Sequence, residues 1–474
     1  MTNQEDNNSK PKAGGINRRH FLGLMGTGAV AGAATLSGCG GSTQTQYDQG
    51  GHHTTEVPTD QMTYRTNPHN GDKISILGYG CMRWPTLKDP DNPDRDISID
   101  QETVNELVDY ALAHGVNYFD SSPVYVRGWS EEATGKALAR HPRDSYFVAT
   151  KCSNFGSNDY DAGVQMYRKS LENFHTDHID YYLMHSIGGG GVEALKARYF
   201  DNGLVDFFLK EKEAGHIRNF GWSFHGDVEV FDYMMQLHDS GEFHSDFVQI
   251  QMNYLDWKIA QGASVGCEYL YNELEKRNIP VVIMEPLLGG RLANLPIHIV
   301  SRLKQANYEN SVASWAFRFC GSYPDVLCVL SGMTYMENLQ DNVRSFAPLV
   351  ELTDDEKEFL YETASLINEY PTIPCNQCQY CMPCPYALDI PAILTHYNKC
   401  VNEGNVPESS QDPNYRKARQ AFLVGYDRSV PKLRQADHCT NCGQCVPHCP
   451  QQIQIPQEMT RISEFVEKLK QNTL

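Results

Sequence analysis

The chain of 474 residues lacks three features that would place it in a familiar functional class. It has no run of about 18 consecutive apolar residues, so no membrane-spanning helix is expected. Basic residues are not in excess, because 59 acidic against 40 basic side chains give a net charge of −19, which argues against a nucleic-acid partner. No Gly-x-Gly-x-x-Gly follows an expected strand, so a Rossmann site is not supported. The 41% of hydrophobic residues nevertheless suffices for roughly two or three domains.

Cysteine is distributed unevenly along the chain. Eight of the fifteen cysteines fall in two tight runs, whereas small disulfide-stapled domains spread theirs more evenly, so the pattern indicates metal binding. The second run has the spacing that bacterial ferredoxins use for [4Fe–4S] clusters, and the first run is one residue shorter in its last gap. The two runs are Cys375-x2-Cys378-x2-Cys381-x2-Cys384-Pro385 and Cys439-x2-Cys442-x2-Cys445-x3-Cys449-Pro450.

The resemblance to two-cluster ferredoxins implies that the fourth cysteine of each run serves the other cluster. The implied ligand sets are Cys375, Cys378, Cys381 with Cys449, and Cys439, Cys442, Cys445 with Cys384. Segments 392–400 and 414–424 have helical patterns, so a small helical ferredoxin-like domain with two [4Fe–4S] clusters is expected over residues 351–474. Zinc is the main alternative, since paired Cys-x2-Cys motifs also hold it, and disulfides are a weaker one.

The first 39 residues are predicted to be an export signal. Arg18-Arg19-His20-Phe21-Leu22 and the weakly apolar stretch after it resemble the twin-arginine signal, which carries folded proteins. Leu36-Ser37-Gly38-Cys39 resembles a bacterial lipobox, whose cysteine becomes the acylated N-terminus. The expectation is therefore a protein on the periplasmic side of the cell envelope, held to the membrane by a lipid anchor only. Residues 40–62 are expected to form a flexible tether, and a chance apolar N-terminus is the alternative.

Apolar strand-like runs alternate with amphipathic stretches through the middle of the chain. Eight strands, each followed by a helical pattern, predict a (β/α)8 TIM barrel over residues 63–350. The expected strands are 74–82, 116–121, 146–151, 179–185, 217–223, 247–253, 279–285 and 326–331.

Polar residues collect where these strands end, which is where TIM barrels place their chemistry. Asp120 ends the second strand, Lys151 the third and His185 the fourth, with Tyr125 just beyond the second. The constellation resembles the aldo-keto reductase family. The segments that carry the resemblance are Phe119-Asp120-Ser121-Ser122-x-x-Tyr125, Thr150-Lys151, Tyr181-Tyr182-Leu183-Met184-His185-Ser186 and Gly221-Trp222-Ser223-Phe224.

The resemblance implies a role for each of these four residues. Tyr125 would give a proton to the carbonyl oxygen that receives hydride, and His185 would orient that carbonyl. Lys151 would lower the pKa of Tyr125, favouring the phenolate, and Asp120 would hold Lys151.

The resemblance also implies a nicotinamide cofactor. The expected contacts are Ser223, Gln249, Pro286, Leu287 and Asn342. The basic residues that usually clasp the 2′-phosphate are absent, which leaves NADP and NAD both open.

Two functions are consistent with these features. The first is an exported oxidoreductase that transfers hydride between nicotinamide and a small carbonyl or alcohol, with clusters that pass electrons to a redox partner protein. The alternative is a non-catalytic, envelope-anchored barrel with structural or redox-sensing clusters.

Overall fold

The computed structural model describes residues 57–258 and 265–474, with the side chains of 92–95 left out. The predicted export signal, Cys39 and most of the predicted tether lie outside this range. The last tether residues do not fit the prediction, because Met62 is buried against the barrel. Within the described ranges, no helix combines the length and the apolar character that crossing a bilayer requires.

Eight parallel strands close into a barrel, which confirms the predicted fold. Neighbours in the barrel are neighbours in sequence, and β12 pairs with β3 to close it, with Val329 opposite Leu77. The barrel strands are β3 (Leu77–Gly80), β6 (Tyr118–Asp120), β7 (Phe147–Cys152), β8 (Ile179–Ile187), β9 (Ile217–Phe224), β10 (Val248–Gln251), β11 (Val281–Met284) and β12 (Val326–Ser331). The expected strand 74–82 is divided between β2 (Lys73–Ser75) and β3, because β2 pairs with β1 (Tyr64–Thr66) instead.

Amphipathic helices surround the barrel. In the first, Val104, Leu107, Val108 and Ala111 are buried on one face, and the Asp100 side chain caps the helix start, as its sequence predicts. The main helices of the barrel are α2 (Gln101–Ala113), α3 (Ser130–Leu138), α4 (Tyr160–Phe174), α6 (Leu204–Glu213), α7 (Val228–Ser240), α8 (Cys267–Glu275), α9 (Ile297–Ala306), α10 (Val312–Gly321) and α11 (Met336–Phe346). A short helix, α5 (Gly191–Leu195), follows β8, and a hairpin of β4 (Thr86–Asp89) and β5 (Asn92–Ile99) precedes α2.

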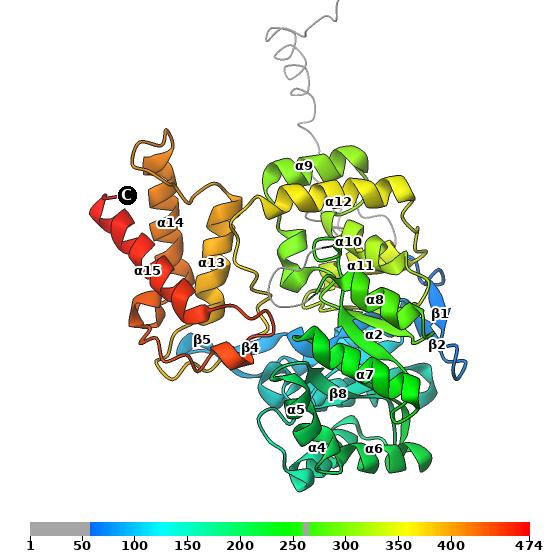
Figure 1. Ribbon diagram of the computed structural model, residues 1–474. Coiled ribbons are helices and arrows are strands. Elements are labelled where there is room, and N and C mark those ends of the chain that lie inside the picture. The colour runs from blue at the N-terminus through cyan, green and yellow to red at the C-terminus, as the bar shows by residue number, and fades with distance from the viewer. Residues whose placement is uncertain (1–56, 259–264) are drawn as a thin grey trace, which may run out of the picture. The chain divides into compact units, whose positions relative to one another are not determined.

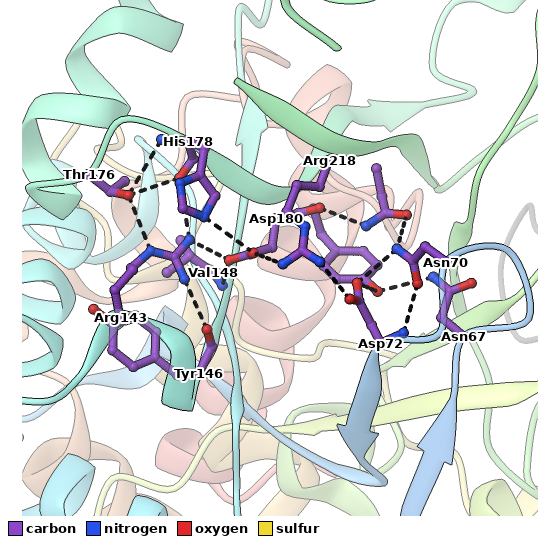
Figure 2. Close-up of polar contacts among 12 residues, drawn as sticks. Asn67, Asn70, Asp72, Arg143, Tyr146, Val148, Thr176, His178, Asp180 and Arg218 are labelled. Atoms are coloured by element: carbon purple, nitrogen blue, oxygen red, sulfur yellow. Dashed lines mark hydrogen bonds and ion pairs between the residues drawn. The ribbon is translucent and has the colours of Figure 1, made fainter. Parts of the chain in front are cut away.

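A polar network closes the N-terminal end of the barrel (Figure 2). The buried Asp180 carboxylate, at the start of β8, accepts hydrogen bonds from Arg143 (2.6 Å), Arg218 (3.1 Å) and the Val148 amide (2.8 Å). Arg218 also bonds Asp72 in the β1–β2 turn at 2.8 Å. Because TIM barrels place their chemistry at the opposite, C-terminal end of the strands, we assign this network to stability.

Helix α12 (Asp354–Asn368) belongs with the barrel, beside α9 (Figure 1). Its Leu360, Ala364 and Ile367 pack into the barrel's hydrophobic core, and Arg302 of α9 bonds Thr363. The predicted boundary after residue 350 is therefore too early, because α12 needs the barrel to bury its apolar face.

A separate core begins at Ile373 and forms the predicted helical domain. It is built from α13 (Ile390–Asn402), α14 (Tyr415–Ser429) and α15 (Ile455–Gln471), seen together in orange and red in Figure 1. Both cysteine runs lie in irregular segments that pack against this core, one before α13 and the other before α15.

Candidate functional site

The structure brings Asp120, Tyr125, Lys151 and His185 together at the C-terminal end of the barrel strands. Lys151 Nζ lies 2.6 Å from Asp120 Oδ1, 2.7 Å from Oδ2 and 2.8 Å from the carbonyl oxygen of Ser121. Both side chains of this ion pair are almost completely buried. The ammonium also lies over the Tyr125 ring, 5.0 Å from its centre, so its charge acts on the phenol across the face of the ring.

His185 is held in one orientation by two serine hydroxyls. Its Nδ1 lies 2.6 Å from Ser153 Oγ and 3.4 Å from Ser122 Oγ, which leaves Nε2 to face the site. Its ring meets the Tyr125 ring edge to face at 5.9 Å. Burial, together with the positive charges of Lys151 and Arg198, lowers the pKa of His185 well below its usual value. The imidazole is therefore neutral, and Nε2 is available for a hydrogen bond.

Burial acts on the pKa of Tyr125 in the direction opposite to the effect expected of Lys151. Burial raises the pKa of Tyr125 well above its usual value of 10, and nearby Tyr380, Asp120 and Glu285 raise it further. Burial therefore favours the neutral phenol at rest, and the lowering of the pKa that Lys151 is expected to cause stays a prediction. Tyr125 is a neutral phenol, which is the form that donates a proton.

Two of the predicted cofactor residues, Ser223 and Gln249, end up side by side on β9 and β10. Ser223 Oγ accepts a hydrogen bond from the Ser186 amide at 2.7 Å. The Gln249 side chain is buried, and its Oε1 atom has no hydrogen-bond partner in the described residues. An unpaired buried acceptor costs free energy unless a donor arrives, so this atom fits the amide group of a nicotinamide.

The other predicted cofactor residues lie after β11 and on α11. Pro286 is buried and Leu287 half-buried, in the turn that leads into a short helix at Leu288–Ala293. Asn342 Nδ2 donates to Ser331 Oγ at the end of β12, at 2.9 Å. These residues are all near the strand ends, but only Gln249 carries a free buried acceptor among the five.

The eight cysteines fall into two groups by their electrostatic neighbours. Cys375, Cys378 and Cys381 each interact with Cys449, whereas Cys445 interacts with Cys384, Cys439 and Cys442; Cys381 also interacts with Cys445. This grouping agrees with the ligand sets that the resemblance to two-cluster ferredoxins implies, in which the fourth cysteine of each run serves the other cluster. We call Cys375, Cys378, Cys381 and Cys449 the first set, and Cys384, Cys439, Cys442 and Cys445 the second set.

The donor chemistry of both sets fits iron–sulfur clusters. Burial and the neighbouring sulfurs raise the pKa of Cys375 to about 11 and that of Cys445 to about 11. Thiolates brought this close repel one another, and cationic iron between them removes that repulsion. All four cysteines of the second set line a cavity of about 250 Å³.

Tyr380, which the sequence did not single out, joins the first cysteine set to the barrel site. Its hydroxyl lies 3.4 Å from His185 Nε2, and its electrostatic interaction with Tyr125 raises the pKa of Tyr125. Its ring lies 5.8 Å from the ring of Phe155, which in turn lies 4.9 Å from His185. No local pattern predicts this contact, because 195 positions separate Tyr380 from His185.

Comparisons with known proteins agree with this geometry. A family model described as "Aldo/keto reductase family" matches residues 77–362, and one described as "4Fe-4S dicluster domain" matches residues 374–454. The second match decides between clusters and zinc in favour of clusters.

Two curated relatives match along nearly all of their own length. An L-galactose dehydrogenase from Arabidopsis thaliana is 24% identical over 65% of this chain and 95% of its own. An NADH-specific methylglyoxal reductase from Escherichia coli is 25% identical over 62% of this chain and 96% of its own. The solved structure of an aldo-keto reductase from Bacillus halodurans superposes with a TM-score of 0.51 at 21% identity, over 64% of this chain and 96% of that one, which supports the fold.

Proposed function

The chain belongs to the aldo/keto reductase family of oxidoreductases and carries a 4Fe–4S domain, and from this premise we propose an exported enzyme that couples hydride chemistry to electron transfer. The barrel transfers hydride between NADP or NAD and a small carbonyl or alcohol. Two [4Fe–4S] clusters exchange single electrons with a redox partner protein. The observation that carries the proposal is the contact of Tyr380, which lies between two cysteines of the first set, with the Tyr125–His185 pair.

In the reductive direction, the barrel residues bind and protonate the substrate's carbonyl oxygen. His185 Nε2 and the Tyr125 hydroxyl face one point, where that oxygen is held and the carbonyl polarised. A bound nicotinamide supplies the hydride that the carbonyl carbon receives. As negative charge grows on the oxygen, Tyr125 gives its proton, and an alcohol results.

Lys151 stabilises the phenolate that forms when Tyr125 gives up its proton. Its ammonium is fixed by Asp120 and lies 5.0 Å from the ring, so it favours the phenolate formed in that step. This charge lowers the free-energy cost of forming the phenolate, while burial of the ring keeps Tyr125 a neutral phenol in the resting protein.

The side chains that would hold the nicotinamide are those that end β9 and β10. Gln249 Oε1 offers an unpaired acceptor to the carboxamide, with Ser223 beside it. Pro286, Leu287 and Asn342 lie further around the strand ends.

The cysteine sets account for the electron-transfer part of the proposal. A [4Fe–4S] cluster carries one electron at a time, whereas nicotinamide gives up two electrons together as hydride, so exchange between them requires a further group of the flavin class that divides the pair. The first set is the one near the barrel site, and the second set, with Cys442 exposed, would face the partner protein.

The N-terminal sequence supports the location. The twin-arginine and lipobox motifs imply export after cofactor insertion, then anchoring through Cys39. Fractionation of cells that express the wild type, Cys39→Ala and a variant with Arg18 and Arg19 changed to Lys tests this. The arginine variant should remain inside the cell, and Cys39→Ala should be exported but released from the membrane; unchanged distribution of both would contradict the location.

The function is tested on full-length protein purified without oxygen. We expect broad absorbance near 400 nm, about eight irons per chain, and oxidation of NADPH or NADH in the presence of small aldehydes or quinones. Tyr125→Phe should keep its iron and lose that oxidation, and spectra of the reduced clusters should appear when wild type receives an alcohol, nicotinamide and a flavin to divide the electron pair. Equal turnover in Tyr125→Phe, or a colourless protein, would contradict the proposal.

A further inference from the structure

Tyr380 belongs by sequence to the cluster domain and by contact to the barrel. It lies two residues after Cys378 and directly before Cys381, both in the first set. Its side chain nevertheless reaches the two groups that the proposed mechanism assigns to the substrate's oxygen, the Tyr125 hydroxyl and His185 Nε2.

The Tyr380 hydroxyl occupies the position that the mechanism requires for a carbonyl oxygen. A bound carbonyl needs its oxygen beside both Tyr125 and His185 Nε2, and here the oxygen in that place is the protein's own. Behind it, the Tyr380 ring packs against Phe155 at 5.8 Å and against His185 at 6.3 Å. A planar ring that bears one oxygen therefore already fills the site.

Several contacts fix the segment that presents Tyr380. The Asn376 carbonyl accepts a hydrogen bond from Arg83 at 2.7 Å, and its side chain donates to Glu285 at 3.0 Å. Gly289, at a φ of +66°, lies so close that a Cβ there would approach the Asn376 oxygen to 2.1 Å. Just after the second cysteine run, the Gln451 side chain donates a hydrogen bond to Gln251 at the end of β10, at 2.9 Å.

We propose that Tyr380 is an internal occupant of the substrate site, holding the place of the carbonyl oxygen and its adjoining ring until a substrate displaces it. This proposal deepens the proposed function and rests on the roles given there to Tyr125 and His185. The substrates that suit the vacated site are planar aromatic carbonyl compounds, because, like Tyr380, they present a flat ring with an oxygen at its edge.

The position of Tyr380 between two cysteines ties the site to the first cluster. A cluster bound by Cys378 and Cys381 limits how far the intervening residues can move. Entry of substrate therefore requires the Tyr380 side chain to leave the site while Cys378 and Cys381 stay on the cluster. The apparent affinity for substrate is then the intrinsic affinity multiplied by the fraction of molecules in the open form.

Binding of a small phenol to a variant that lacks the Tyr380 ring tests directly whether that ring occupies the substrate site. Full-length Tyr380→Gly, with iron content and absorbance near 400 nm matching wild type, should bind p-cresol in calorimetry, whereas wild type should not. Toluene, which has the ring without the hydroxyl, should bind about tenfold more weakly, since the two hydrogen bonds are lost. Tyr386→Gly is the matched control, because Tyr386 is exposed and follows a cysteine of the second set, and it should not bind p-cresol.

A second variant covers the case in which Tyr380→Gly does not retain its clusters. Tyr380→Phe keeps the ring and removes the hydroxyl, so the open fraction rises, and the KM for benzaldehyde should fall about tenfold with kcat unchanged. An unchanged KM, or a loss of kcat, would overturn the proposal, as would equal p-cresol binding in wild type and Tyr380→Gly or none in either.

The two readouts separate this inference from the proposed function. Binding of p-cresol requires no turnover, so a protein that reduces no carbonyl can still show that Tyr380 fills the site. Conversely, carbonyl reduction with no p-cresol binding to a cluster-loaded Tyr380→Gly would retain the function and remove Tyr380 from the substrate site.

Discussion

The Lys151 ammonium lies 2.6 and 2.7 Å from the two carboxylate oxygens of Asp120, in a region that solvent does not reach. Burial lowers the pKa of Lys151 and raises that of Asp120, and each charge opposes the effect on the other. Each group therefore depends on its partner to remain charged, and the pair behaves as one unit under Tyr125.

Removal of one member of this pair should cost more than removal of both. Asp120→Asn or Lys151→Met leaves a buried charge without its partner, and each should lower the free energy of unfolding by about 3–5 kcal/mol. The Asp120→Asn/Lys151→Met double variant should recover much of that loss, while all three lose carbonyl reduction. Denaturant unfolding of the cluster-loaded protein measures this, and a double-variant loss equal to the sum of the single losses would argue against a coupled pair.

Tyr125 should remain protonated throughout the neutral and mildly alkaline range. Its pKa is raised by burial, and a phenol stays neutral at every pH below its pKa. The difference in tyrosinate absorption between wild type and Tyr125→Phe should therefore stay flat between about pH 7 and 10. If Lys151 governed the pKa of Tyr125, one tyrosine would ionise in that interval and the difference spectrum would grow.

The network around Asp180 should control stability without affecting catalysis. Asp180→Asn removes the charge that Arg143 and Arg218 share (Figure 2), and we expect a loss of about 3 kcal/mol in the free energy of unfolding. The kcat should not change, because the network lies at the end of the barrel opposite Tyr125. Glu172→Gln is the control: its ion pair with Lys169 is exposed, so its loss should be below about 1 kcal/mol. A fall in kcat for folded Asp180→Asn would mean that the two ends are coupled.

The sequence predicted the barrel because its information is local. Each strand is a short apolar run and each helix an amphipathic pattern, and the strand order follows the chain order, so periodicity alone locates Asp120, Lys151 and His185 at one end. The two cysteine runs are recognised in the same way, from spacing within about ten residues.

What the sequence could not give depends on contacts between distant segments. Tyr380 has no distinguishing pattern beyond lying between cysteines, and its contact with His185 exists only after two domains pack. The sequence likewise shows a lysine near Tyr125 but not the burial of the tyrosine ring, which raises its pKa. Helix α12 was assigned to the wrong domain because its apolar face does not reveal which core it covers.

Gln249 offers a test in which stability and cofactor affinity should change in opposite directions. Its Oε1 atom is buried and has no partner in the described part of the chain, so Gln249→Leu removes an unsatisfied acceptor. The cofactor-free variant should be as stable as wild type or more stable by about 1 kcal/mol, while its affinity for NADPH or NADH falls about tenfold. Thermal unfolding and calorimetric titration measure the two quantities.

Gln251, two residues further along the same strand, is the matched control for that change. Its side chain is satisfied, with bonds to Asp256 at 2.7 Å and Gln451 at 2.9 Å. Gln251→Leu should therefore destabilise the protein by about 1–3 kcal/mol, since it leaves its partners unpaired. If Gln249→Leu destabilised the protein by as much as Gln251→Leu and bound nicotinamide as wild type does, Gln249 would be a structural residue, and the carboxamide of the cofactor would have to be recognised elsewhere.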